Sequence, residues 1–319
     1  MKNTKIFIAG HEGMVGSSLL EELNENNYTN ILTKSHSDLD LTRQLEVEKF
    51  IKKNKPELVI IAAGKVGGIK SNDIYSAEFI YQNMMIAINL INSCFISGVN
   101  KIIFLGSSCI YPKISNQPVL ENELLAGKVE STNEAYAIAK IAGIKLCQFY
   151  NKQYGTKYIS LMPTITYGPR DNFNIENGHV IPGLINKFHH AKVNSLPYIE
   201  VWGSGNQSRE FIFVRDIATS VHYISKKLIQ NDYQELIKNN LINIGTSNEI
   251  TINKLSYLIR DIVGFKGDIK FDTSKPDGTI RRVLNSQIIK KIGWKPLYNL
   301  EDGLKQTYDW YLKSIKIKH

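Results

Sequence analysis

A glycine-rich turn follows the first apolar run of the chain and opens directly into a helical pattern. In "FIAGHEGMVGSSL", Gly10, Gly13 and Gly16 come after residues that predict a short buried strand. Glycine lets another group approach the backbone closely, and the free N–H groups at the start of a helix attract an anion such as a pyrophosphate. The segment therefore predicts a strand–turn–helix unit that holds a dinucleotide, with Met14 and Val15 beside it.

Short apolar runs alternate with helical patterns along about the first 170 residues. This alternation favours right-handed crossovers between parallel strands, so we expect an α/β fold: a doubly wound parallel sheet of the Rossmann type. The regularity then weakens, which predicts a smaller mixed α/β C-terminal substrate domain. We assign residues 1–170 to a dinucleotide-binding domain with a return segment near 211–230, and residues 171–319 mainly to the substrate domain. Strands are expected at 5–9, 30–34, 57–63, 101–108 and 158–164, and the main helices at 15–24, 45–55, 77–97 and 133–154.

The basic excess of the chain is spread along it rather than gathered in one segment. The formal net charge is +9 over 319 residues and comes mostly from scattered Lys, which indicates a solvated surface, so we expect no nucleic-acid partner. Three cysteines without a CxxC or Cys/His spacing predict neither a disulfide framework nor a metal site. We see no signal-length N-terminal apolar stretch and no run long enough to span a membrane, so we expect a cytoplasmic protein without membrane contact.

The second predicted strand, "NILTK", ends without the acidic residue that would bind a ribose 2′-hydroxyl. Lys34 and His36 follow it and are placed to meet a 2′-phosphate, so NADP is favoured over NAD as the cofactor. Glu12 in the glycine turn argues the other way, because its charge would repel a phosphate. Asp40 and Leu41 are expected near the adenine.

In "STNEAYAIAKIAGIK", Tyr136 and Lys140 are four residues apart and therefore lie on one face of a helix. A tyrosine with an ordinary pKa of about 10 exchanges protons poorly at neutral pH, and a nearby ammonium lowers that pKa. Ser107, at the end of a predicted strand, is placed to hydrogen-bond a carbonyl group that is being reduced. Ser131 and Glu134 form a capping-box pattern that predicts where the helix starts.

A lone thiol stands near the end of the strand in "FLGSSCIYPK". From the residues alone, Cys109 is either a small core residue or a reactive thiol. His179 in "NGHVIP" is likewise either a residue at a helix start or part of a site.

These motifs together give the chain a specific likeness. It resembles the extended short-chain dehydrogenase/reductases and, within them, the GDP-L-fucose synthases, which are NADP-dependent GDP-4-keto-6-deoxy-D-mannose 3,5-epimerase/4-reductases. The likeness runs over nearly the whole chain and implies a homodimer paired through the helices 77–97 and 133–154, and a role in building surface polysaccharide. The matching stretches include "FIAGHEGMVGS", "AAGKVGGI", "FIYQNMMI", "FLGSSCIYPK", "TNEAYAIAKIAGIKLC", "YGPRDNF", "HVIP", "VWGSG", "REF" and "KPDGT".

The resemblance implies an oxidoreductase that also moves protons next to a ketone. Cys109 matches the position of the base, and His179 that of the acid, in the inversion of C3 and C5. A thiol suits this work when a nearby positive charge or a helix end lowers its pKa from about 8.5. Further cofactor contacts are implied for Leu105, Gly106, Ser108, Lys140, Pro163, Thr166 and His179.

The resemblance also makes the C-terminal domain the part that binds the nucleotide sugar. Candidates for contacts with GDP are Lys187, Trp202, Arg209 and Asp277. Lys187 stands where the family commonly has Arg, so a bidentate contact becomes a point charge.

Several positions near the expected substrate depart from the family pattern. Ile165 and Thr166 stand in "MPTITYGP" where Asn and Leu are common, and Glu12 replaces an Arg. Because the scaffold is kept while the substrate rim differs, one alternative stays open: C4 reduction of a GDP-4-keto-6-deoxy-heptose with little or no epimerase activity. A third interpretation is a non-catalytic nucleotide-binding regulator, against which intact Ser107 and Tyr136 argue.

Overall fold

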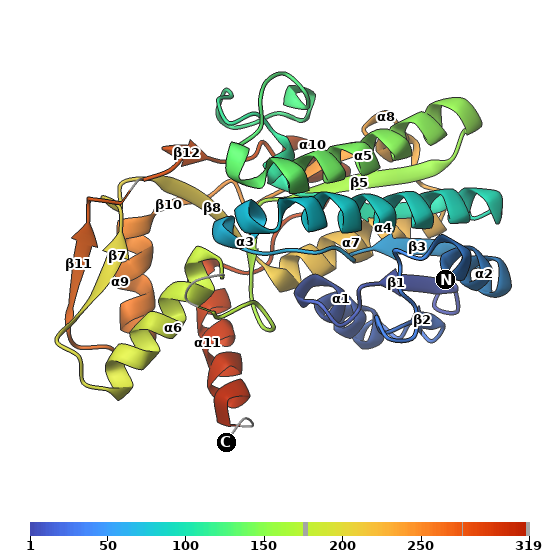
Figure 1. Ribbon diagram of the computed structural model, residues 1–319. Coiled ribbons are helices and arrows are strands. Elements are labelled where there is room, and N and C mark those ends of the chain that lie inside the picture. Colours follow the sequence, from blue (N-terminus) through green and yellow to red (C-terminus); the bar gives the residue numbers. More distant parts are fainter. Residues whose placement is uncertain (175–177, 276, 317–319) are drawn as a thin grey trace.

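Six parallel strands form the large sheet of the molecule (Figure 1). The computed structural model describes residues 1–174, 178–275 and 277–316. The strand order reverses between β1 and β3, and in doubly wound sheets ligands bind at the carboxyl ends of the strands at such a point. In spatial order the strands are β2 (Ile31–Thr33), β1 (Ile6–Ala9), β3 (Leu58–Ile61), β4 (Lys101–Leu105), β5 (Lys157–Pro163) and β9 (Leu241–Ile244).

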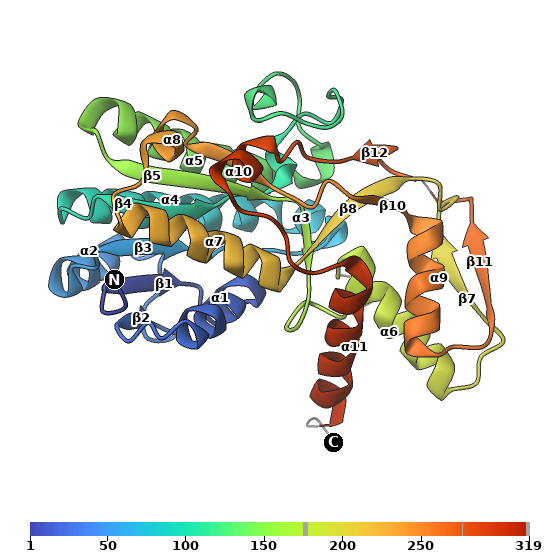
Figure 2. The ribbon, with the colours of Figure 1, turned by 180° about the vertical axis from the view of Figure 1, so that it is seen from behind.

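Helices cover both faces of the large sheet. On one face, a core that includes Val47, Leu90 and Ile144 lies beneath α2 (Gln44–Asn54), α4 (Ser76–Ile96) and α5 (Glu134–Tyr154). On the other face, which Figure 2 brings to the front, α1 (Met14–Glu25), α7 (Val214–Ile229), α8 (Gln234–Lys238) and α10 (Gln287–Ile292) share a second core. The predicted doubly wound α/β fold is therefore confirmed.

A smaller region of short sheets and helices lies beside the large sheet (Figure 1). It has its own core, in which Phe188, Leu255 and Phe265 are buried. One of its sheets contains β6 (Ile165–Tyr167), β8 (Ser208–Phe213), β10 (Glu249–Thr251) and β12 (Arg281–Arg282), and the other pairs β7 (Tyr198–Trp202) with β11 (Asp268–Asp272). The helices of this region are α6 (Val180–Val193), α9 (Ile252–Val263) and α11 (Leu300–Lys316).

The chain crosses between the two regions more often than the sequence indicated. Within the return segment expected near 211–230, α7 packs on α1, whereas β8 belongs to the small sheet. Residues 241–244 then add the edge strand β9 to the large sheet, which the sequence analysis did not predict. The short helix α3 (Ile69–Ile74) was also missed. The division at residue 170 stays a prediction.

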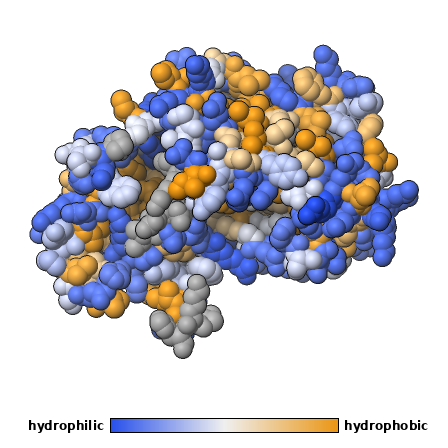
Figure 3. All heavy atoms as spheres, in the orientation of Figure 1, coloured by the Kyte–Doolittle hydropathy of each residue, from blue (hydrophilic) through white to orange (hydrophobic). Residues whose placement is uncertain are grey.

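One described helix, α4, is long and apolar enough to cross a membrane when judged by length and composition alone. The expectation that no apolar run is long enough to span a membrane is therefore wrong for α4, by length and composition. Within the protein, α4 packs against α2 and α5, and its side chains at Leu90, Ile91 and Cys94 are buried in the core. Apolar side chains are visible on the face of the molecule that α4 and α5 form (Figure 3).

Candidate active site

The glycine turn forms a cradle between β1, the neighbouring backbone and the start of α1. Gly10 has φ +87°, a conformation that favours glycine, and a Cβ there would lie 2.7 Å from the backbone of Ala63. A Cβ at Gly16 would collide with the carbonyl group of Gly10. Gly13 caps α1 without a side-chain hydrogen bond, so the N–H groups of the first turn of α1 have no side-chain acceptor at that position. These features fit a bound pyrophosphate.

Lys34 and His36 are exposed just after β2, and Glu12 is exposed in the glycine turn. Asp40 accepts hydrogen bonds from the backbone N–H and the hydroxyl of Thr42, at 2.9 and 2.7 Å. Burial opposes the charge of Asp40, but these hydrogen bonds hold its pKa below the ordinary value. A lysine, a histidine and a fixed carboxylate thus follow β2, where the sequence predicted the adenosine half of the cofactor.

Ser107 and Tyr136 meet at the carboxyl end of β4. Ser107 lies two residues after the end of β4, and its hydroxyl accepts a hydrogen bond from the backbone N–H of Cys109 at 3.3 Å. The Ser107 hydroxyl interacts with the phenol of Tyr136, which stands in the first turn of α5, and this interaction favours the ionised phenol. The two residues predicted to bind one carbonyl oxygen therefore lie side by side.

Lys140 stands one turn after Tyr136 and is 6% exposed. Its Nζ donates to the carbonyl O of Leu105 at 2.9 Å and lies 5.7 Å from the centre of the Tyr136 ring. Burial lowers the pKa of Lys140 to about 8. The predicted face shared by Tyr136 and Lys140 is therefore present, with the ammonium beneath the phenol and bound to the end of β4.

Two expectations about this helix are wrong. Burial raises the pKa of Tyr136, and the thiol of Cys109 adds to the rise, because both disfavour a phenolate more strongly than the Ser107 hydrogen bond favours it. The expected capping box is absent as well. Residues Ser131–Asn133 form a short 3-10 helix, and α5 starts after Asn133 without a side-chain cap.

Cys109 lies in a short 3-10 helix, Ser108–Ile110, and is partly exposed. Cys94 and Cys147 are buried and have pKa values that burial raises. Cys109 interacts electrostatically with Tyr136 and with Arg282 of β12. The sequence analysis missed Arg282, because its only local signal is the dipeptide "RR" in a segment with no clear period.

His179 is exposed at the residue before α6 and makes no side-chain cap. It interacts electrostatically with Asp171, whose pKa is raised by burial despite the nearby imidazole. Among the described residues no hydrogen bond or ion pair joins His179 to Cys109. The predicted acid is therefore not assembled with the predicted base in this state of the protein.

The remaining cofactor candidates follow the ends of β4 and β5. Gly106 packs so closely on Met162 that a Cβ there would collide with its sulfur. Ser108 is buried, and Leu105 offers its carbonyl O to Lys140. Pro163 ends β5, and Thr166 lies in β6 with its hydroxyl donating to the carbonyl O of Thr164 at 3.1 Å.

Of the predicted nucleotide residues, Trp202 and Arg209 lie on the small sheets, Lys187 lies on α6 and Asp277 lies in a loop. Trp202, at the end of β7, is 64% exposed, and the Lys187 and Lys275 ammonium groups lie 5.4 and 5.9 Å from the centre of its ring. Asp277 accepts hydrogen bonds from the backbone N–H and the hydroxyl of Ser204, the latter at 2.8 Å. Two cations and an open aromatic face thus stand together where a base and a phosphate are expected.

Arg209 lies on β8 opposite Arg282 of the parallel strand β12. Burial and the charge of Arg282 lower the pKa of Arg209. Two partly buried guanidinium groups held on neighbouring strands favour an anion between or beside them.

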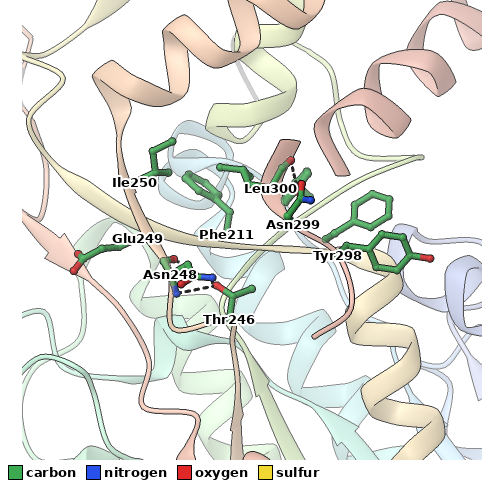
Figure 4. A pocket seen from close by; sticks show the side chains of 10 residues that line it. Phe211, Thr246, Asn248, Glu249, Ile250, Tyr298, Asn299 and Leu300 are labelled. Atoms are coloured by element: carbon green, nitrogen blue, oxygen red, sulfur yellow. Dashed lines mark hydrogen bonds between the residues drawn. The ribbon is translucent and has the colours of Figure 1, made fainter. Parts of the chain in front are cut away.

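Two cavities are lined by residues other than the predicted site residues. One, of about 100 Å³, lies under β8 and is lined by Tyr167, Phe211 and Tyr298 together with other apolar and amide side chains, none of them a predicted site residue (Figure 4). Another, of about 310 Å³, is lined by residues at the starts of α4 and α5, including Glu134 and Ala135 just before Tyr136. No group of three or more His, Cys, Asp or Glu side chains suited to a metal occurs in residues 1–174, 178–275 and 277–316.

Residues 6–245 match the model of the NAD dependent epimerase/dehydratase family. A protein of Arabidopsis thaliana named GDP-L-fucose synthase 1 is 48% identical over 314 residues, which cover 98% of this chain and 95% of that protein. GDP-L-fucose synthase of Sinorhizobium fredii is 48% identical over 311 residues, 98% of this chain and 96% of that protein.

Solved structures with the same fold extend the comparison. MlghC, a GDP-mannoheptose C4 reductase from Campylobacter jejuni solved with NADP bound, matches with a TM-score of 0.88 and 36% identity. The match covers 98% of this chain and 99% of that one.

Proposed function

The chain belongs to the NAD dependent epimerase/dehydratase family, in the group that contains the GDP-L-fucose synthases, and from this premise we propose its reaction. It is an NADP-dependent oxidoreductase that reduces C4 of a GDP-linked 4-keto-6-deoxy sugar after inverting C3 and C5. The observation that carries the proposal is the meeting of Ser107, Tyr136 and Lys140 at the end of β4, beside the glycine cradle.

In the reduction, Ser107 and Tyr136 hold the C4 carbonyl oxygen by hydrogen bonds. Tyr136 gives its proton to that oxygen as negative charge develops there, and the raised pKa keeps the phenol protonated until then. Lys140, charged below a pH of about 8, then stabilises the phenolate from one turn below. When bound, the nicotinamide supplies the hydride that reaches C4.

In the epimerisation, we assign the base to Cys109 and the acid to His179. The C4 ketone acidifies the hydrogens at C3 and C5, and the thiolate takes such a proton while the electron pair of the C–H bond forms an enolate. His179 returns a proton to the opposite face. Because no contact joins the two side chains, this assignment requires that the sugar lie between them.

For the cofactor, we propose that the glycine cradle takes the pyrophosphate and that Lys34 and His36 take the 2′-phosphate, which favours NADP over NAD. For the substrate, we assign GDP to Trp202, Lys187, Arg209 and Asp277. Asp277 must exchange its bonds with Ser204 for bonds to the ligand. We further propose a cytoplasmic homodimer paired through the outer faces of α4 and α5, where Tyr81, Ile88, Ile138 and Phe149 are exposed, and a role in surface polysaccharide.

One experiment tests the reaction and its main alternative. The protein is incubated in D2O with NADPH and either GDP-4-keto-6-deoxy-mannose or the corresponding 4-keto-heptose, and the products are analysed by NMR. We expect deuterium at C3 and C5 together with reduction at C4. Absence of NADPH oxidation with both sugars would contradict the proposal and favour a non-catalytic nucleotide-binding protein.

A second candidate, C4 reduction of a GDP-4-keto-6-deoxy-heptose without epimerisation, is favoured by the likeness to a heptose C4 reductase and by Ile165 and Thr166 at the substrate rim. Its signature in the same experiment is reduction of the heptose without deuterium at C3 or C5.

A further inference from the structure

Arg282 is a cation that reaches from the small sheet into the loop that carries Cys109. Its Nη1 donates to the carbonyl O of Pro112 at 3.0 Å, three residues beyond Cys109. The guanidinium also interacts electrostatically with the Cys109 thiol itself. One side chain therefore contacts the backbone of this loop and acts on its reactive atom.

The backbone on either side of Arg282 is fixed by neighbours from distant parts of the chain. Arg282 pairs with Arg209 of β8. Val283 donates to the side-chain O of Gln117 at 2.9 Å, and Leu284 donates to the buried carboxylate of Glu210 at 2.8 Å. Because the strand pairing and these two bonds hold Arg282 and the residues that follow it, the guanidinium is presented to the loop from a fixed backbone.

The groups that act on Cys109 come from two packed elements. Tyr136 of α5 is uncharged near neutral pH, because burial raises its pKa. Arg282 of β12 is charged, with Arg209 and Glu130 as its own charged neighbours. The nearby ammonium of Lys140 is bound to the carbonyl O of Leu105. Arg282 is thus a cation that interacts with the thiol.

We propose that Arg282 is a positioning residue for Cys109, holding its loop and stabilising the thiolate that removes the proton next to the ketone. In that step the C–H bond breaks, its electron pair forms the enolate, and the sulfur takes the proton to become a neutral thiol. The inference rests on the proposed epimerisation for its role in turnover, but the state of the thiol is measurable in the free protein.

Stabilising a thiolate has two opposite effects. It raises the fraction of the cysteine that is present as thiolate, and it lowers the intrinsic nucleophilicity of that thiolate. For a shift of about one pH unit in such an equilibrium, the thiolate population changes about tenfold well below the midpoint. The intrinsic reactivity of a thiolate changes in the opposite sense by only about threefold for the same shift. On this proposal the net gain from Arg282 is about threefold at neutral pH.

The test is the rate of alkylation of Cys109 by iodoacetamide from pH 6 to pH 10, with the modified cysteine identified by peptide mass spectrometry. Cys94 and Cys147 are buried, and a Cys109→Ser variant gives the background. In Arg282→Gln we expect the midpoint of the pH–rate curve to move up by about one pH unit, with a rate about threefold lower at pH 7. Arg282→Lys keeps the charge and should keep the midpoint near that of the wild type.

Arg281→Gln is the matched control, since it removes the same charge from the same strand. Arg281 is exposed and forms a two-point ion pair with Glu249, away from the thiol. An equal shift in Arg281→Gln, or an equal shift in Arg282→Lys and Arg282→Gln, would overturn the proposal. If thermal unfolding shows that Arg282→Gln does not fold, Arg282→Lys is compared with Arg281→Gln instead. An upward shift of the midpoint of the pH–rate curve in Arg282→Lys would then overturn the proposal.

The same variants test turnover. With the 4-keto sugar in D2O, Arg282→Gln should lose at least about threefold in deuterium incorporation at pH 7 and recover towards the wild-type rate at pH 9, which a purely structural loss would not do. If the wild type itself incorporates no deuterium, the proposed epimerisation fails, whereas the alkylation curves continue to decide the role of Arg282.

Discussion

The proposed catalytic residues and the proposed nucleotide residues are held in different ways. Lys140 is buried at the end of β4, and its ammonium has a fixed backbone acceptor. Trp202 lies mostly in solvent, and Asp277 accepts hydrogen bonds from a loop residue, Ser204. The first group is organised before any ligand arrives, whereas the second must exchange its own contacts for those of the ligand.

Substitution of Tyr136 should give the largest effect. Tyr136 is the proposed proton donor, and no other residue of the proposed catalytic group is assigned to donate that proton. In Tyr136→Phe, NADPH oxidation with the 4-keto sugar should fall by about 10²–10⁴-fold, which steady-state absorbance measures. Tyr150→Phe on the same helix is the matched control, since it also loses one hydroxyl, which donates to Asn92 at 2.8 Å. A loss below tenfold in Tyr136→Phe would show that another group supplies the proton.

Lys140→Met should show the energetic cost of organising the site. Burial lowers the pKa of Lys140 from 10.5 to about 8, so between these values the unfolded chain binds a proton that the folded protein does not. This term destabilises the fold fully below about pH 8 and disappears above about pH 10.5. Chemical unfolding of wild type and variant at pH 7 and pH 10.5 measures it.

We expect the unfolding free energy of the wild type relative to Lys140→Met to rise by about 3 kcal/mol at most from pH 7 to pH 10.5. The lost bond to Leu105 shifts both measurements alike, so only the change with pH is diagnostic. Lys145→Met on the same helix, where the ammonium bonds the side chain of Gln148, is the matched control. An unchanged difference for Lys140→Met would mean that its ammonium is not destabilised by burial.

Trp202→Ala should give the smallest effect. The constant that changes should be the KM for the GDP sugar, not kcat. Loss of an exposed stacking surface weakens binding of the base by about 1–3 kcal/mol, so the KM for the GDP sugar should rise by about tenfold with kcat nearly unchanged. Tyr198→Ala, on the same strand with its ring against Lys270 at 3.6 Å, is the control. A fall in kcat with KM unchanged would place Trp202 with the organised group and remove the contrast.

The large sheet was predictable because its signals are local. The glycine turn, the strand ends and the four-residue spacing of Tyr136 and Lys140 each lie within one element, where periodicity and turn chemistry are sufficient. β9 was missed because "LINI" is a short apolar run that does not distinguish a strand from a helix, and its partner β5 lies far earlier in the chain.

The rest of the site depends on neighbours that are distant in sequence. Arg282 acquires its role from Pro112 and Arg209, which the chain brings to it only through the fold. The expected fall in the pKa of Tyr136 was wrong because burial, which a four-residue spacing does not report, raises that pKa. The capping box failed because Asn133, and not Ser131, precedes the helix.

The late arrival of β9 has a consequence for synthesis of the chain. β5 pairs on one side with β4 and on the other only with β9, whose first residue is Leu241. A nascent chain that ends before that residue carries seven residues of apolar strand, Lys157–Pro163, as an open edge. Such an edge is a template for pairing with another chain, so the ribosome must extend the protein through its smaller region before the larger one is protected from aggregation.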